Sequence, residues 1–129
     1  MAQSIHDFHD DPRNADIRIW INGTLKPRAE ATVSVFDSGF VLGDGVWEGL
    51  RAIDGHPVFL DEHLDRLFEG AKAIALDIGM DRAQLTRALY DTLDANGMRD
   101  GVHMRLMVSR GVKRTPYQDP RATVGPATV

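Results

Sequence analysis

The sequence predicts an α+β fold in which a mixed, mainly antiparallel sheet carries two helices on one face. Two Asx-Gly pairs, Asn22-Gly23 and Asp54-Gly55, stand between extended segments, where such pairs are strong hairpin signals. Two central segments, 61–76 and 81–96, place apolar residues at helical spacing. A later segment, 102–109, has the period-two pattern of a half-buried strand.

The N-terminal part of the chain divides into an arm and a hairpin. Residues 1–16 are polar and acidic, and we expect them to form a mobile arm or a dimer contact. Residues 17–21 predict a strand, and 24–26 predict its return partner, which Pro27 ends. The β-branched and apolar segment 31–36 is interpreted as another short extended piece.

A glycine-rich segment separates the two hairpins. Residues 37–45 include three glycines within seven residues, which argues against a regular helix and predicts a shaped loop. Residues 46–53 then predict a strand that turns into an extended segment at 57–60.

The two predicted helices have different start signals. Asp61 occupies the expected N-cap position of the first helix. Asp81 with Gln84 has the spacing of a capping box at the start of the second, which Asn96-Gly97 ends. After the strand at 102–109, residues 111–121 predict a polar loop, and 122–129 predict a further extended segment.

The strand at 102–109 predicts one apolar face and one polar face. Met104, Leu106 and Val108 share a face that we expect to contact the helices. His103 and Arg105 lie on the opposite face, which is either solvated or covered by another domain or subunit. In the second case Arg105 is a candidate for binding an anion.

A second arginine stands beside the apolar stripe of the first helix. His63 and Arg66 are three residues apart and project from the same side. Arg66 therefore needs an anionic partner. That partner is either an acid of the same helix or the phosphate or carboxylate of a ligand, which a planar guanidinium fits well; the helix acids are Glu62, Asp65 and Glu69.

Composition excludes several classes of function. The net charge of −4 argues against a nucleic-acid partner, and no apolar run reaches the ~20 residues of a membrane span. There is no cysteine, so disulfides are excluded, and we expect a cytoplasmic protein. The five histidines lack metal-ligand spacing, so no metal site is expected. Gly43, Gly45 and Gly49 do not have the spacing of a dinucleotide-binding motif.

Three segments together resemble the class IV, or fold-type IV, aminotransferases, which include D-amino-acid, branched-chain and (R)-amine transaminases. Residues 36–51, FDSGFVLGDGVWEGLR, are similar to that family's glycine-rich segment. Residues 60–67, LDEHLDRL, resemble its H-x-x-R-L helix start, and residues 108–111, VSRG, resemble a strand end in the D-amino-acid and lyase branches.

The resemblance implies a two-domain, dimeric enzyme that depends on pyridoxal 5′-phosphate (PLP). Residues 17–129 would form the small N-terminal domain, and the C-terminal domain would carry the lysine that forms the Schiff base. We expect that lysine beyond Val129, since Lys26, Lys72 and Lys113 stand in no matching context and nothing around them indicates burial. The 129-residue chain alone is therefore expected to be inactive.

The resemblance also assigns the expected site residues. Arg66 matches the arginine that binds the PLP phosphate. The remaining matches concern the pocket for an amino donor and a 2-oxo acid: Trp47 as an aromatic wall, Arg51 as a basic pocket position, Arg105 and Arg114 as carboxylate-binding arginines, and His103 as a neighbour.

Two other functions are compatible with the sequence. A PLP lyase of the same fold, resembling aminodeoxychorismate lyase, would share Ser109-Arg110-Gly111. A non-enzymatic domain that dimerises or binds a small anion would need no lysine. A requirement for a keto-acid acceptor separates the transaminase from the lyase, and a parent reading frame continuing into a lysine-bearing domain excludes the non-enzymatic alternative.

Overall fold

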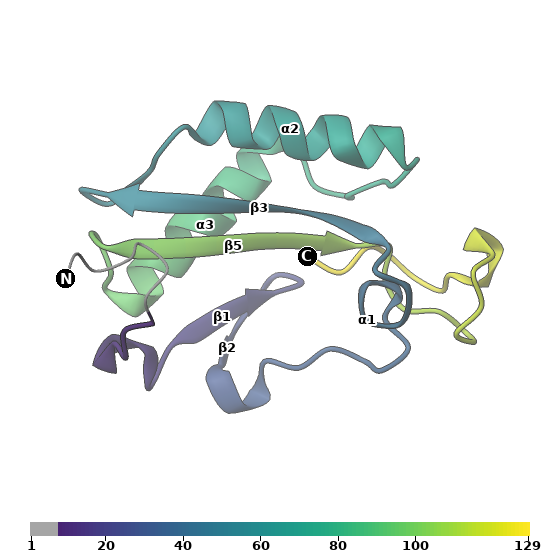
Figure 1. The fold of residues 1–129 in the computed structure, drawn as a ribbon, viewed down its shortest axis with the longest axis horizontal. Coiled ribbons are helices and arrows are strands. Elements are labelled where there is room, and N and C mark those ends of the chain that lie inside the picture. Colours follow the sequence, from purple (N-terminus) through teal and green to yellow (C-terminus); the bar gives the residue numbers. More distant parts are fainter. Residues whose placement is uncertain (1–7) are drawn as a thin grey trace.

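The structure is a computed structural model that describes residues 8–129; residues 1–7 of the expected arm, which include His6, lie outside the described part. It has the α+β architecture that the sequence predicts (Figure 1). The strands are antiparallel but form two sheets, a two-stranded one and a three-stranded one in the order β4-β3-β5. Within residues 8–129, no helix is both long enough and apolar enough to cross a membrane.

The first sheet is the predicted hairpin. Strands β1 (Arg18–Ile21) and β2 (Thr24–Pro27) pair antiparallel. Asn22 and Gly23 both have positive φ, 49° and 91°, which is the geometry of a two-residue type I′ turn. Before the hairpin, Arg13 donates to the carbonyls of Asp100 and Gly101, so this part of the arm is attached to the domain.

The expected extended piece at 31–36 is wrong. A 3-10 turn at Arg28–Glu30 precedes an irregular segment. The segment pairs with none of the strands, and its apolar side chains Val33, Val35 and Phe36 are exposed.

The expectation that residues 37–45 form no helix is also wrong. Helix α1 (Ser38–Leu42) begins where the Asp37 carboxylate accepts the amide hydrogen of Gly39 at 2.8 Å. It ends at Gly43, whose φ of 65° suits the left-handed C-cap. Only Gly39 of the three glycines lies inside the helix; Gly43 ends it, and Gly45 begins the next strand.

The second sheet consists of β3 (Gly45–Ile53), β4 (His56–Pro57) and β5 (Val102–Ser109). It confirms the two longer predicted strands. The extended segment expected at 57–60 stops at Pro57, because Phe59 turns into the left-handed region at φ 54° and Leu60 begins the next helix.

Helices α2 (Leu60–Ala73) and α3 (Arg82–Asn96) follow the predicted periodicity. The assignment of Asp61 as N-cap is wrong: Phe59 holds that position without a side-chain bond, and Asp61 lies in the first turn. A negative charge there is still favourable for the helix dipole. The capping box of Asp81 and Gln84 is confirmed, with both bonds at 2.8 Å.

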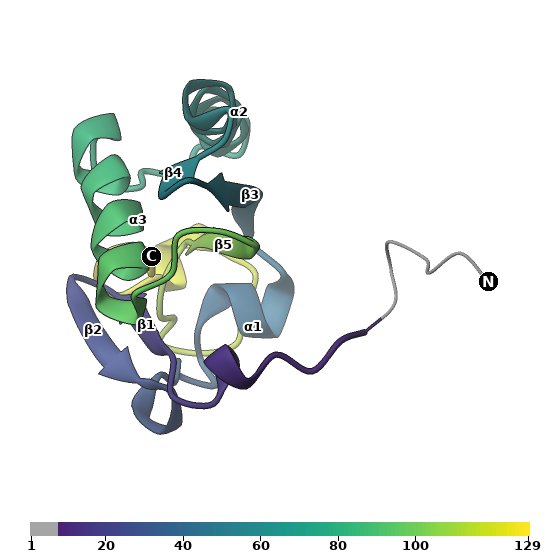
Figure 2. The same ribbon diagram turned by 90° about the vertical axis from the view of Figure 1, so that its left-hand side faces the viewer.

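The core lies between the two helices and one face of the three-stranded sheet (Figure 2). Both helices contribute leucines, and the predicted inward face of β5 is confirmed, since Met104, Leu106 and Val108 are buried. Leu50 and Ala52 of β3 complete this layer. The opposite face of the sheet carries no helix from α2 or α3, which leaves its side chains accessible.

The C-terminal segment is irregular rather than extended throughout. A 3-10 turn at Pro120–Ala122 opens the stretch expected to be extended. Beyond it, single antiparallel bridges join Lys113 to Thr123 and Ser109 to Thr128. The last residues therefore lie against the end of β5, between the two sheets (Figure 1).

Candidate active site

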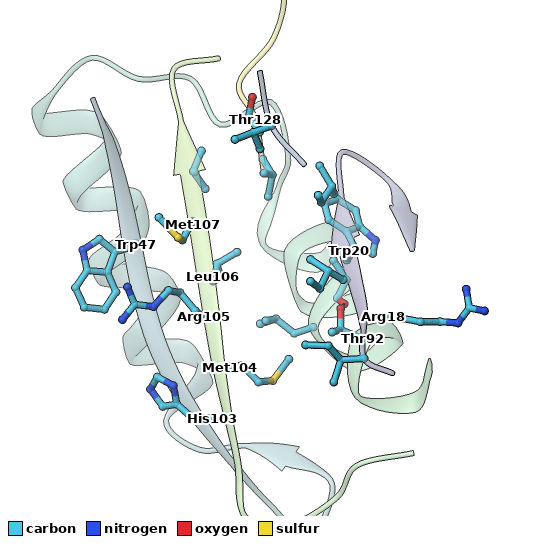
Figure 3. Close-up of a pocket in the computed structure, with 18 of the residues that line it drawn as sticks. Arg18, Trp20, Trp47, Thr92, His103, Met104, Arg105, Leu106, Met107 and Thr128 are labelled. Atoms are coloured by element: carbon cyan, nitrogen blue, oxygen red, sulfur yellow. The ribbon is translucent and has the colours of Figure 1, made fainter. Parts of the chain in front are cut away.

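The exposed face of the three-stranded sheet brings together four of the six predicted site residues. Trp47 and Arg51 come from β3, and His103 and Arg105 come from β5. The register places Arg51 opposite His103, and Gly49 opposite Arg105. In the close-up, Trp47, His103 and Arg105 project to the same side of the two strands (Figure 3).

Arg105 and Trp47 form the centre of this face. The guanidinium carbon of Arg105 lies 4.4 Å from the centroid of the indole ring, a cation–π arrangement. Among the described residues, Arg105 has no ion-pair partner. Trp47 is 56% exposed. The pair therefore offers a positive group for a carboxylate next to an apolar surface for a side chain.

Gly49 makes room for the neighbouring ring. A Cβ atom at Gly49 would lie 3.0 Å from Nε2 of His103, so the imidazole lies over the glycine. A larger residue between Trp47 and Arg51 would displace His103 from this face.

A second cluster forms around Glu48, a buried residue of β3. Its carboxylate accepts two bonds from Arg66, from Nε at 2.7 Å and from Nη2 at 2.6 Å. Nδ1 of His63 lies 2.6 Å from the same carboxylate. The cluster joins β3 to α2 on the opposite side of the strand from Trp47, because successive strand residues point to opposite faces.

The Glu48 carboxylate is held in its ionised form. The hydrogen bonds from Arg66 lower the pKa of Glu48 to about 2, against the opposing effect of burial, and His63 adds to the lowering. An ionised carboxylate only accepts hydrogen bonds, so Nδ1 of His63 must carry the donated proton.

This cluster excludes one of the two kinds of partner that the sequence left open for Arg66. The partner is Glu48 rather than an acid of the same helix, and Asp65 pairs with Arg82 instead. Sequence reasoning missed Glu48 as a functional residue. A signal was available, because Glu48 shares its strand face with Leu50 and Ala52, where an acid needs a partner.

Arg66 fits an anionic ligand. Its side chain is 70% exposed although Glu48 is buried. Glu48 holds Nε and Nη2, whereas Nη1 makes no hydrogen bond within residues 8–129. The guanidinium is therefore fixed in orientation and retains a donor for an anionic group such as a phosphate.

Arg114 and the lysines lie apart from both clusters. Arg114 is exposed in the loop after β5, and its side chain makes no ion pair within the described residues. Lys113 is buried, at 2% exposure, and donates to the carbonyl of Asp119 at 3.2 Å. The expectation that no lysine of this chain is buried is therefore wrong, because the loop folds back over Lys113.

The Ser109-Arg110-Gly111 segment has a structural role in this domain. Arg110 pairs with Asp44 at 2.8 Å and donates to the carbonyls of Ile74 and Ala75, just after α2. Gly45 lies against β5, and a Cβ there would clash with the backbone carbonyl oxygen of Val108. Gly45 and the Ser109-Arg110-Gly111 segment therefore meet at the same end of the sheet.

No group of three or more His, Asp or Glu side chains in residues 8–129 is arranged to hold a metal ion. The two candidate sites for an anionic ligand among the predicted residues are the sheet face around Arg105 and the exposed edge of Arg66.

The chain is similar in sequence and in fold to known proteins. Residues 45–126 match the amino-transferase class IV family. The chain is 47% identical over 109 residues to branched-chain-amino-acid aminotransferase-like protein 1 of Arabidopsis thaliana, covering 84% of this chain and 20% of that protein. It is 38% identical over 102 residues to the D-alanine aminotransferase of Bacillus licheniformis, covering 79% and 36%.

Solved structures agree with the sequence relatives. The branched-chain aminotransferase of Thermoproteus uzoniensis, solved with norvaline, matches with a TM-score of 0.73 and 27% identity, over 88% of this chain and 38% of that one. The 4-amino-4-deoxychorismate lyase of Pseudomonas aeruginosa matches with a TM-score of 0.65 and 34% identity, over 84% and 37%. The chain therefore belongs to the class IV aminotransferase family.

Proposed function

We propose that this chain is the N-terminal domain of a PLP-dependent transaminase that moves an amino group between an amino acid or amine and a 2-oxo acid. The observation that carries the proposal is the Arg105–Trp47 pair on the exposed sheet face, at 4.4 Å. Amino acids and 2-oxo acids both have a carboxylate beside the reacting carbon, and the unpaired guanidinium supports binding of that group.

The sheet-face residues would orient the substrate. Arg105 binds the carboxylate, and the Trp47 indole contacts the substrate side chain. Arg51 and His103 flank this position, and Gly49 keeps the surface between them low enough for a ligand. A substrate fixed at two points presents its amino group in one orientation, which lowers the entropic cost of reaction.

Arg66 would hold the phosphate of PLP, with Glu48 and His63 keeping its guanidinium in place. When bound, PLP acts as the electron sink that allows the amino group to be transferred. Glu48 contributes as a positioning residue, because its two bonds to Arg66 restrict the rotation of an otherwise exposed side chain.

The proposal concerns a longer protein. The chain spans 20% of the Arabidopsis relative and 36% of the Bacillus relative. The proposed complete protein adds a C-terminal domain with the PLP-binding lysine, assembles as a homodimer and acts in the cytoplasm. Sedimentation and cell fractionation test the last two parts separately from activity.

The direct test is an assay of the complete protein with PLP. It is supplied with a panel of L-amino acids, D-amino acids and amines, each with and without a 2-oxo acid acceptor. A transaminase forms the new amino acid only when donor and acceptor are both present. Absence of amino transfer with every pair would contradict the proposal.

A lyase is the second candidate, supported by the 34% identity to the Pseudomonas enzyme. A lyase would release its product from 4-amino-4-deoxychorismate without any acceptor. Product formation that is independent of added 2-oxo acid would therefore favour the lyase, whereas strict dependence favours the transaminase.

A further inference from the structure

The loop after β5 folds around a buried lysine. Residues 112–124, called here the Lys113 loop, leave the end of β5 and return toward it (Figure 1). Residues 114–118 at its tip are all exposed, whereas Lys113 is among the largest fully buried side chains of the described residues. Because a lysine is rarely buried unless its charge has a partner, the contacts of this ammonium group decide what the residue does.

Backbone hydrogen bonds hold the base of the loop together. The amide of Lys113 donates to the carbonyl of Phe36 at 2.9 Å, which fixes the outgoing limb against the segment before α1. The amide of Arg114 donates to the carbonyl of Ala122 at 2.8 Å, which joins the outgoing limb to the returning one. Within residues 8–129, no backbone bond joins residues 115–121 to any part of the chain outside the loop.

The ammonium of Lys113 supplies a contact inside the loop. It donates to the carbonyl of Asp119, six residues further along the chain, at 3.2 Å. The hydrogen bonds from Arg121, and to a smaller extent the charge of Lys113, lower the pKa of Asp119. The ammonium therefore lies against a carbonyl and near an ionised carboxylate, which together offset part of the cost of burying its charge.

Arg121 keeps Asp119 in the position that Lys113 uses. Nε and Nη2 of its guanidinium donate to Oδ2 of Asp119 at 2.9 and 2.5 Å, and its amide donates to Oδ1 at 2.9 Å. The carboxylate thereby caps the 3-10 turn Pro120–Ala122, whose last carbonyl accepts the bond from Arg114. Lys113 and Arg114, neighbours in the chain, are thus connected a second time through the returning limb.

The Lys113 loop leaves the sheet at the end that carries part of the candidate site. Gly45 of β3 pairs with Ser109, the last residue of β5, and Trp47 lies two residues from this end. Arg114 is the predicted site residue that the loop carries, and its side chain is exposed. It makes no ion pair within the described residues, so its guanidinium can bind an anion.

We propose that Lys113 is a positioning residue: its buried ammonium holds the loop in one conformation and so fixes Arg114 as a binding group for a substrate carboxylate. A guanidinium on a fixed loop loses less conformational entropy when it binds than one on a mobile loop. The carboxylate ligand rests on the proposed function, whereas the fixing of the loop by Lys113 does not.

Arginine-specific proteolysis of the 129-residue chain tests the fixing of the loop. Cleavage after Arg114 requires local opening of the tip. We expect Lys113→Met, which keeps the apolar stem and removes the ammonium, to be cleaved there at least about tenfold faster than the unaltered chain. Lys72→Met is the matched control, since Lys72 is an exposed lysine of α2, and it should be cleaved at the unaltered rate. Equal cleavage of all three chains would overturn the proposal.

Acetylation of the unaltered chain covers the case in which Lys113→Met fails to fold. Peptide mapping should show Lys113 reacting at least about tenfold more slowly than Lys72 in the folded chain, and at the same rate in denaturant. Equal rates in the folded chain would overturn the proposal. Neither cleavage nor acetylation uses PLP or activity, so their failure is distinguishable from failure of the proposed function.

Kinetics of the complete enzyme test the connection to Arg114. Lys113→Met should raise KM for α-amino acids about fivefold or more, change kcat less than about twofold, and leave KM for amines without a carboxylate unaltered. Arg114→Met should give the same pattern, and the double variant should be no worse than the more affected single variant, because both remove one contact. Equal losses for both donor classes, or losses that add in the double variant, would overturn the positioning role.

Discussion

The guanidinium of Arg66 is held by the carboxylate of Glu48 through two hydrogen bonds of 2.7 and 2.6 Å. The carboxylate is buried in the sheet, whereas the arginine is 70% exposed. The two bonds fix the orientation of the long Arg66 side chain, whose remaining N–H groups can donate to a ligand at the protein surface. The proposed phosphate contact therefore depends on β3, which carries Glu48, as well as on α2, which carries Arg66.

Replacing Glu48 with glutamine should destabilise the domain and change its response to acid. The pKa of Glu48 is lowered in the folded state to about 2 from an ordinary value of 4.5. Its ionised form therefore contributes stability above pH 4.5, and that contribution is lost as the pH falls from 4.5 toward 2. We expect a loss of about 1–3 kcal/mol at neutral pH.

Urea unfolding of the 129-residue chain between pH 2.5 and 7 measures both effects. The Glu48→Gln variant should lose less stability than the unaltered chain across the acid range. Glu69→Gln is the control, since Glu69 is an exposed acid on α2. Parallel pH curves for the unaltered chain and Glu48→Gln would show that the Glu48 pKa is not depressed.

Replacing Arg66 with alanine should weaken retention of PLP by the complete enzyme. A charge-assisted phosphate contact that is shielded from water contributes on the order of 2–5 kcal/mol. Cofactor absorbance after dialysis measures the loss, with Arg87→Ala as control because Arg87 lies on α3, away from the Glu48 cluster. Unchanged occupancy in Arg66→Ala would remove this arginine from the cofactor site.

Replacing Arg105 with methionine should lower kcat/KM for α-amino acids much more than for amines that lack a carboxylate. The expected loss is on the order of 2–4 kcal/mol for one guanidinium–carboxylate contact. Steady-state kinetics of the complete enzyme with both donor classes test this. Equal losses for the two classes would mean that Arg105 supports the sheet through Trp47 and does not bind substrate.

The 129-residue chain by itself should show no transaminase activity and form no stable covalent adduct with PLP. Burial alone does not make Lys113 reactive here, because its amine is directed to the Asp119 carbonyl inside the folded loop. Borohydride treatment with PLP, followed by peptide mapping, measures any adduct. A stoichiometric adduct at Lys26, Lys72 or Lys113, accompanied by turnover, would locate the reactive lysine within this chain.

Local signals in the sequence determined most of the regular elements. The Asn22-Gly23 turn and the Asp81 capping box depend on residues within four positions of each other, so their geometry could be predicted. The alternation in β5 likewise predicted which side chains face the core and which form the face of Arg105. These features are local consequences of backbone geometry and apolar spacing.

Contacts between distant segments were decided only by the tertiary structure. Glu48 and Arg66 are separated by 18 residues, and nothing local indicates that strand and helix bring them together. Lys113 is buried because a polar loop folds over it, and residues 31–36 remain irregular because no strand edge lies beside them. The separation of β1–β2 from the three-stranded sheet has the same origin, because the local pattern of a strand does not specify which strand it pairs with.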